Sequence, residues 1–167
     1  FFVHSGIETG ITIRYQPASD VGADRICNAV GAFARYSGPC IVVDFGTATP
    51  LDAIAANGDY LGGAILPGIG ISMDALFRHA ARLYRVELIA PPQAIGDTTV
   101  HAMQSGLVFG FAGQTDAMVE RFRQEYPDLA GLDCETPEEV ADDADALVLV
   151  TEWQQYLELD WEALAAR

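Results

Sequence analysis

Hydrophobic residues along the first 126 positions recur with two spacings, either every second residue or every third to fourth. Positions 11–15 alternate between apolar and polar side chains, as in a strand with one exposed face. Positions 22–36 repeat apolar residues at helical spacing instead. The patterns predict, in chain order, a strand at 11–15, a helix at 22–36, strands at 40–43, 51–56 and 60–66, and helices at 72–83 and 98–126.

Turn residues separate these segments. Ser37-Gly38-Pro39 ends the first helix, and Asn57-Gly58 predicts a tight hairpin between two of the strands. Residues 40–43 form an unbroken apolar run, which predicts a strand covered on both faces. The order strand–turn–strand–turn–strand–helix resembles the ribonuclease-H-like fold of sugar kinases, actin and Hsp70. We therefore expect an α/β protein: a ribonuclease-H-like lobe with a mixed sheet and packed helices, followed by a short α/β tail.

Charge marks a boundary within the chain. The formal net charge is −15, all nine basic residues are arginines, and residues 131–167 hold eleven carboxylates but one arginine. We therefore divide the chain into residues 1–37, 38–128 and 129–167. A protein this acidic would repel a phosphate backbone, so nucleic acid is not an expected partner.

Composition narrows the class further. Half of the residues are hydrophobic, as in globular proteins, and no apolar run approaches the ~20 residues of a membrane span. The three cysteines contain no Cys-x-x-Cys pair, which favours reduced thiols in the cytoplasm. The three histidines have no ligand spacing, so we expect no His/Cys metal site.

The turn at residues 44–49 (Asp-Phe-Gly-Thr-Ala-Thr) is the first candidate for chemistry. Gly46 has no Cβ, so its backbone can approach an anion closely. The hydroxyls of Thr47 and Thr49 could donate to phosphate oxygens, and Asp44 could hold a cation beside them. The alternative is an ordinary hairpin with an Asx-type turn.

The starts of two helices carry further candidates. In Gly22-Ala23-Asp24-Arg25, Asp24 could act as a general base toward a hydroxyl, and Arg25 offers a planar fork for a carboxylate. An acidic residue in a first helical turn more often only stabilises the helix end. At the start of the last helix, Thr98 or Thr99 is most simply an N-cap.

Taken together, five stretches within about residues 1–126 resemble the type III pantothenate kinase family in order and spacing. They are Pro17 with Val21-Gly22-Ala23-Asp24-Arg25, then Val42-Val43-Asp44-Phe45-Gly46-Thr47-Ala48-Thr49, Tyr60-Leu61-Gly62-Gly63-Ala64-Ile65-Leu66-Pro67-Gly68, Ile95-Gly96 with Thr99, and Met103-Gln104-Ser105-Gly106. In that family's terms, residues 1–37 would be the remnant of the first kinase lobe, and residues 38–128 the second, ribonuclease-H-like lobe.

The resemblance implies an ATP-dependent phosphotransferase that converts pantothenate to 4′-phosphopantothenate, the first step of coenzyme A biosynthesis. Asp24 would take the proton of the pantothenate hydroxyl, and Arg25 would face the pantothenate carboxylate. Asp44 would bind an activating monovalent cation, K⁺ or NH₄⁺, alongside ATP and Mg²⁺. The other implied contacts are Gly22, Ala23 and Thr99 to pantothenate, and Gly46, Thr47 and Thr49 to the phosphates. The resemblance also implies a homodimer with pantothenate at its two-fold interface, to which the helix at 98–126 contributes.

The chain departs from the family pattern at three places. It contains neither the family's Asp-x-Gly-Asn-[Ser/Thr] turn, a second phosphate and Mg²⁺ cradle, nor a Thr-Gly-Gly region after residue 126. Pro50 stands where the family has a second Thr, which removes a hydroxyl and a backbone donor. A second hypothesis is therefore a non-catalytic module that binds pantothenate or a phosphate-bearing ligand, or that only dimerises.

The acidic tail resembles another family. Residues 142–153 and 159–161 are similar to the C-terminal domain of UDP-glucose and GDP-mannose dehydrogenases, over about residues 131–167. The pattern predicts a capped helix, a buried strand at 146–150 and a helix opened by Asp160. A fusion with a fragment of a UDP-sugar dehydrogenase is the third hypothesis, although the chain has no GxGxxG dinucleotide loop.

Overall fold

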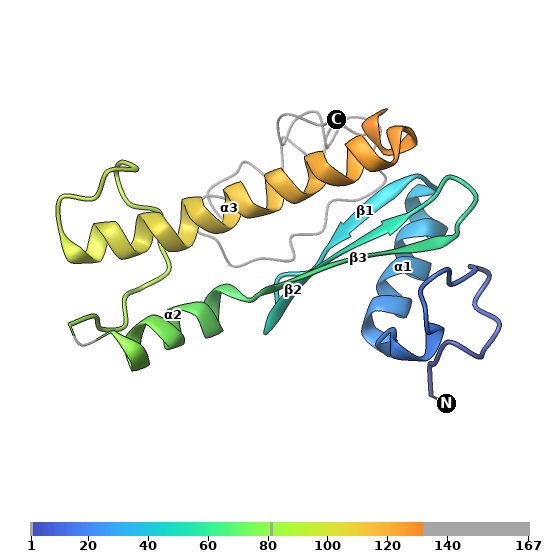
Figure 1. The fold of residues 1–167 in the computed structure, drawn as a ribbon, viewed down its shortest axis with the longest axis horizontal. Coiled ribbons are helices and arrows are strands. Elements are labelled where there is room, and N and C mark those ends of the chain that lie inside the picture. Colours follow the sequence, from blue (N-terminus) through green and yellow to red (C-terminus); the bar gives the residue numbers. More distant parts are fainter. Residues whose placement is uncertain (1, 81, 132–167) are drawn as a thin grey trace, which may run out of the picture.

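A computed structural model describes residues 2–80 and 82–131 (Figure 1). These residues form, in chain order, the 3-10 helix η1 (Ala18–Asp20), α1 (Ala23–Tyr36), β1 (Cys40–Val43), β2 (Ala48–Ile54), β3 (Tyr60–Pro67), α2 (Ile69–His79), α3 (Thr99–Glu125) and the 3-10 helix η2 (Pro127–Gly131). Figure 1 shows α1 beside one end of the sheet, whereas α2 and the first half of α3 extend past the other end. No helix in these two ranges has the length and apolar character to span a membrane. The predicted tail elements lie outside the described residues.

The three strands form an antiparallel sheet in the order β1-β2-β3. The predicted hairpin at Asn57-Gly58 is confirmed. Gly58 has a φ of 86°, which a residue with a Cβ adopts only under strain. The Asn57 side chain accepts a hydrogen bond from the Asp59 amide at 3.1 Å, which closes the turn between β2 and β3.

Strand β1 is less covered than its apolar sequence predicts. All four of its residues are half-buried, and within the described residues only β2 pairs with it. The prediction that both faces are covered is therefore wrong for this part of the chain. Helix α1 contacts this strand, but no described strand lies along its second edge.

The predicted strand at 11–15 is reduced to one bridge. Ile13 pairs in parallel with Tyr60 at the start of β3, through hydrogen bonds from the Tyr60 amide to Thr12 and from the Arg14 amide to Tyr60. This bridge is the only parallel pairing in the described residues, so the mixed character of the sheet rests on it alone.

Helices α1 and α3 lie within one residue of their predicted bounds, but α2 does not. It begins at Ile69, three residues early, and ends at His79, four residues early. The reason for the early start is Gly68, whose amide donates to the Thr47 carbonyl at 3.0 Å. A Cβ at Gly68 would lie 2.2 Å from the Gly46 carbonyl oxygen, so only glycine allows the chain to turn into α2 there.

A hydrophobic core joins α1 to the sheet. Its buried members are Val21, Ile26, Ala29, Ile54 and Tyr60. The core thus combines residues of the predicted segment 1–37 with strands of the segment 38–128. It holds α1 against the sheet and so determines where the first turn of this helix lies.

Candidate functional site

The predicted phosphate-binding turn follows the end of β1. The Asp44 amide donates to the Pro50 carbonyl at 3.1 Å, and the Gly46 amide donates to the Ala48 carbonyl at 3.0 Å. Residues 45–47 are exposed, so the tip of the turn faces solvent. A Cβ at Gly46 would meet no atom closer than 3.6 Å, so the turn itself does not require glycine at this position.

The two predicted threonines of this turn lie in different surroundings. Thr47 is exposed, whereas Thr49 retains only 2 % of its exposure and lies in β2. The Thr49 hydroxyl has no hydrogen-bond partner among the described residues. A buried polar group without a partner costs about 1–3 kcal/mol, which makes this hydroxyl a candidate for contact with a ligand.

Thr49 also faces away from α1. Neighbouring strand residues point to opposite faces of a sheet, and Asp52 of β2 points toward α1 because it pairs with Arg25. Thr49 shares the other face with Leu51 and Ala53. The candidate phosphate contacts are therefore split between the exposed tip of the turn and the far face of the sheet.

The candidate base Asp24 lies in the first turn of α1 and is exposed. A Cβ at Gly22, the N-cap residue, would lie 2.4 Å from the Asp24 carboxylate oxygen Oδ1. The absence of a side chain at Gly22 thus makes room for the Asp24 carboxylate to fold back over the start of the helix. Gly22 and Asp24 are coupled sterically, which the sequence pattern did not show.

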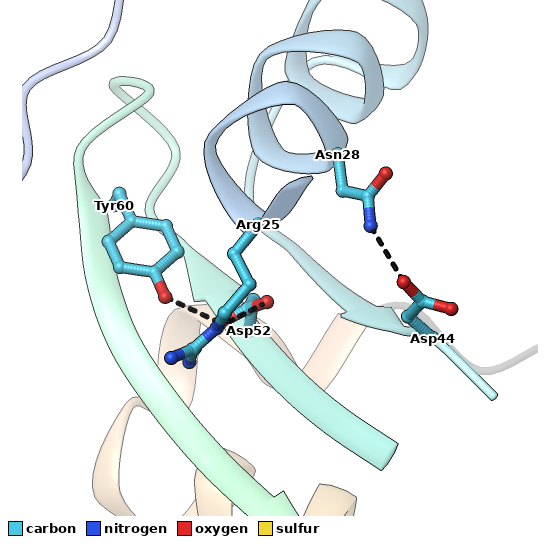
Figure 2. A network of polar contacts seen from close by, with 5 residues as sticks. All are labelled: Arg25, Asn28, Asp44, Asp52 and Tyr60. Carbon is cyan, nitrogen blue, oxygen red and sulfur yellow. Dashed lines mark hydrogen bonds and ion pairs between the residues drawn. The ribbon is translucent and has the colours of Figure 1, made fainter. Parts of the chain in front are cut away.

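Asn28 connects α1 to the turn. Its Nδ2 group donates to Oδ2 of Asp44 at 3.1 Å (Figure 2). Residues four apart lie on the same face of a helix, so Asp24 shares with Asn28 the face that meets Asp44. Sequence reasoning missed Asn28, although its spacing of four from Asp24 was the available signal.

Arg25 is buried and paired within the chain. Its Nε donates to Oδ1 of Asp52 at 3.0 Å, its Nη2 donates to the same oxygen, and the Tyr60 hydroxyl donates to that oxygen as well (Figure 2). The Arg25 and Asp52 side chains are 9 % and 2 % exposed. The guanidinium that was expected to face a substrate carboxylate therefore already binds a carboxylate of its own chain. Asp52 and Tyr60 were missed, although an aspartate within the apolar strand at 51–56 was a signal.

Burial and hydrogen bonding fix the protonation states of Arg25 and Tyr60. Burial alone would lower the pKa of Arg25, but the hydrogen bonds and the negative charge of Asp52 raise that pKa above its ordinary value. Burial, followed by the hydrogen bond to Asp52, raises the pKa of Tyr60. Arg25 is therefore a cation and Tyr60 a neutral hydrogen-bond donor throughout the physiological pH range.

Two grooves lie on different parts of the molecule. A groove of about 390 Å³ between α1 and the end of β1 is lined by Asn28, Asp44, Phe45 and neighbouring residues. A larger, mostly apolar groove of about 980 Å³ lies between α2 and α3 and includes Thr99 and Met103. Asp44 and Thr99, both expected at one substrate site, thus line separate grooves of one chain.

The start of α3 settles which threonine is the cap. The Thr98 hydroxyl accepts a hydrogen bond from the His101 amide at 3.1 Å, so Thr98 is the N-cap, and Thr99 is left exposed. Along the long axis of Figure 1, the start of α3 lies at the end of the molecule opposite to α1. The structure therefore does not bring Thr99 to Asp24 within one chain.

The two cysteines in the described part of the chain should differ in reactivity. Cys27 is exposed and lines this groove, whereas Cys40 is half-buried, and burial raises the pKa of its thiol. The thiolate is the reactive form, so a raised pKa slows alkylation near neutral pH. We expect iodoacetamide to modify Cys27 about tenfold faster than Cys40 at pH 7.5. Peptide mass spectrometry over time measures this, and faster labelling of Cys40 would contradict it.

These features define a mixed α/β protein in which a polar side chain of α1 is hydrogen-bonded to the turn after β1. A family model described as type III pantothenate kinase matches residues 1–121. The chain belongs to the type III pantothenate kinase family.

Relatives extend this result. The chain is 59 % identical over 123 residues to type III pantothenate kinase 2 of Symbiobacterium thermophilum, covering 74 % of this chain and 47 % of the relative. It is 55 % identical over 120 residues to the type III pantothenate kinase of Moorella thermoacetica, covering 72 % and 47 %. The chain thus spans about half the length of these curated relatives.

A solved structure is also similar. It is titled as a conserved putative Baf family transcriptional activator from Campylobacter jejuni, and it covers 65 % of this chain and 49 % of its own. The sequence identity is 24 % and the TM-score is 0.47.

Proposed function

We propose that this chain forms part of an enzyme that phosphorylates pantothenate with ATP, giving 4′-phosphopantothenate in the first step of coenzyme A biosynthesis. The observation that carries the proposal is the family match over residues 1–121, in which both candidate polar segments lie. The hydrogen bond between Asn28 and Asp44 supports it, because it brings the helix face of Asp24 to the turn at 44–49. In this proposal the antiparallel strands β1–β3, followed by α2, belong to a ribonuclease-H-like lobe, and the protein works in the cytoplasm.

On the pantothenate side, Asp24 is the proposed general base. The exposed carboxylate accepts the proton of the pantothenate hydroxyl as that oxygen attacks the γ-phosphorus of ATP, and the bond from this phosphorus to the β,γ-bridging oxygen breaks to release ADP. Gly22 and Ala23 contribute backbone that lies close to the substrate. Arg25 meets the pantothenate carboxylate with the N–H groups that Asp52 does not use.

On the nucleotide side, Gly46, Thr47 and Thr49 are the proposed contacts to phosphate. The exposed tip of the turn supports this for Gly46 and Thr47, and the buried hydroxyl without a partner supports it for Thr49. Phosphoryl transfer depends mainly on positioning and on charge stabilisation, which such donors supply.

Cations would neutralise charge on the same side. Asp44 fits a monovalent cation, because Asn28 engages its Oδ2 while Oδ1 lies toward the turn, 3.9 Å from a Cβ placed on Gly46. Carboxylate oxygen is a suitable ligand for hard cations such as K⁺ and Mg²⁺. When bound, these cations would lower the repulsion between the phosphates and the acidic chain.

A second copy of the chain would complete the substrate site. Thr99 is the proposed pantothenate contact that lies far from Asp24 in one chain, so both can reach one ligand only if they come from different subunits. Exposed apolar side chains near this end of the molecule support the interface. They are Ile71, Leu76 and Phe77 of α2 and Phe109 of α3, whereas Phe111 of α3 is buried.

We therefore expect a homodimer through α2 and α3. Sedimentation velocity at about 10 µM protein should show mainly dimer, because large exposed apolar patches mark interfaces. Phe109→Asp should shift the protein to monomer by placing a charge in the interface. Tyr36→Asp changes an exposed aromatic residue on α1, outside this interface, and should leave the dimer intact. A monomeric wild-type chain would contradict this interface.

The proposed reaction is tested in a hybrid protein, in which residues 1–121 replace the matching segment of the Symbiobacterium relative. We expect pantothenate-dependent ADP release from this hybrid. Asp24→Asn should lower kcat by about 10²–10⁴-fold, the usual contribution of a positioned base. Asp20→Asn removes an exposed carboxylate just before the helix and is the matched control, which should change kcat less than about twofold. An active Asp24→Asn hybrid would overturn the role of Asp24.

A further inference from the structure

The buried contacts of Arg25 point to a role for two residues outside the proposed binding site. We propose that Asp52 and Tyr60 are positioning residues, which orient the Arg25 guanidinium so that it recognises the carboxylate of the substrate. The inference rests on the proposed function for the identity of the ligand. It goes beyond that function because it assigns substrate selectivity to side chains that do not touch the substrate.

One oxygen of Asp52 accepts hydrogen bonds from side chains of two different elements, α1 and β3. Oδ1 of Asp52, on β2, accepts hydrogen bonds from Arg25 on α1 and from the Tyr60 hydroxyl on β3 (Figure 2). The Asp52 carboxylate cannot rotate without breaking one of these bonds. The Arg25 guanidinium carbon also lies 5.9 Å from the centre of the Tyr60 ring, within the range of a cation–π contact. Asp52 and Tyr60 together thus restrict Arg25 to one orientation.

Asp52 uses only some of the N–H groups of Arg25. A guanidinium has five N–H groups, and Asp52 engages the edge formed by Nε and Nη2. The end formed by Nη1 and Nη2 remains for a second carboxylate, which planar guanidinium groups bind in a bidentate manner. Because only 9 % of the Arg25 side chain is exposed, its orientation decides which N–H groups a ligand reaches. A side chain fixed before binding loses less conformational entropy when the ligand arrives.

This role predicts a selective loss of affinity. Tyr60→Phe keeps the ring and the core packing but removes the hydroxyl that holds Asp52. Its affinity for pantothenate should fall about tenfold, the lower end of what losing a supporting contact costs at metal-ligand sites. Its affinity for pantothenol, the alcohol analogue that lacks the carboxylate, should stay the same. Calorimetry with both compounds measures the two dissociation constants. The dissociation constant of pantothenol divided by that of pantothenate should therefore fall about tenfold.

Controls separate positioning from general structure. Tyr126→Phe removes a hydroxyl from an exposed tyrosine at the C-terminal end of α3, which lines neither groove, and should change neither affinity. Asp52→Asn, where it folds, should lower the ratio at least as far as Tyr60→Phe does. An equal loss of affinity for both ligands would show a purely structural role, and unchanged affinities for both ligands would show no role; either result overturns the inference.

A measurement without ligand distinguishes this inference from the proposed function. The Nε–H proton of Arg25 has its own NMR signal, and we expect it to be protected from exchange with water in the wild-type chain. In Tyr60→Phe, this proton should exchange about tenfold faster, while the backbone amides of α1 keep their protection. If the wild type binds neither compound, the proposed ligand is wrong. Unchanged exchange of the Arg25 proton in Tyr60→Phe would instead refute the positioning role.

Discussion

The 167 residues on their own are expected to release ADP from ATP at least about 10²–10³-fold more slowly than the hybrid with the Symbiobacterium relative. Phosphoryl transfer needs donors and metal on both sides of the transferring group, and the loss of a single preorganised donor costs about this factor. The 167 residues contain one Asp-x-Gly-Thr turn, at 44–49, and Pro50 removes a donor beside it.

Pantothenate binding is expected to survive in the isolated chain, because Asp24, Arg25 and Thr99 are all present. A coupled ADP-release assay with ATP, Mg²⁺, K⁺ and pantothenate measures turnover, and calorimetry with pantothenate measures binding. For the isolated chain, the hypothesis of a non-catalytic module also predicts binding without turnover. Turnover equal to that of the hybrid, abolished by Asp24→Asn, would show that the second cradle is dispensable.

Replacement of Asp52 by alanine is expected to lower the free energy of unfolding more than replacement of Asp59, whose ion-pair partner Arg14 is exposed. The side chains of Arg25 and Asp52 are 9 % and 2 % exposed, so Asp52→Ala leaves a buried guanidinium without its counter-ion. Breaking a buried pair from one side costs about 3–5 kcal/mol. The free energy of unfolding, measured by urea denaturation with circular dichroism, should fall by about that amount.

Two further variants identify the cause of that loss. The double variant Arg25→Met with Asp52→Leu removes both charges and keeps apolar volume, so it should recover most of the stability. Asp59→Ala breaks the ion pair with Arg14, whose side chain is 61 % exposed, and should cost far less stability than Asp52→Ala because solvent screens the pair. Equal losses of unfolding free energy in Asp52→Ala and Asp59→Ala would contradict the claim that burial makes the Arg25–Asp52 pair costly to break.

Local chemistry allowed the sequence by itself to predict most elements of the fold. Glycine at 58 tolerates a positive φ, and this local preference placed the hairpin between β2 and β3. Helical spacing of apolar residues predicted α1 and α3 to within one residue, because the same periodicity forms the buried face of each helix. The family resemblance depended on the order and spacing of its motifs, which do not require three-dimensional information, and the family match over residues 1–121 confirms it.

Contacts between distant segments were decided only by the tertiary structure. The early start of α2 depends on Gly68 packing against the turn at 44–49, and the half-burial of β1 depends on which strands lie beside it. Arg25 and Asp52 are 27 positions apart, and Asn28 and Asp44 are 16 apart, so no local pattern pairs them. Propensity and spacing act over a few residues, whereas the partner of a buried charge is set by the packing of α1 on the sheet. For the same reason, only the tertiary structure shows that Thr99 and Asp24 lie at opposite ends of one chain.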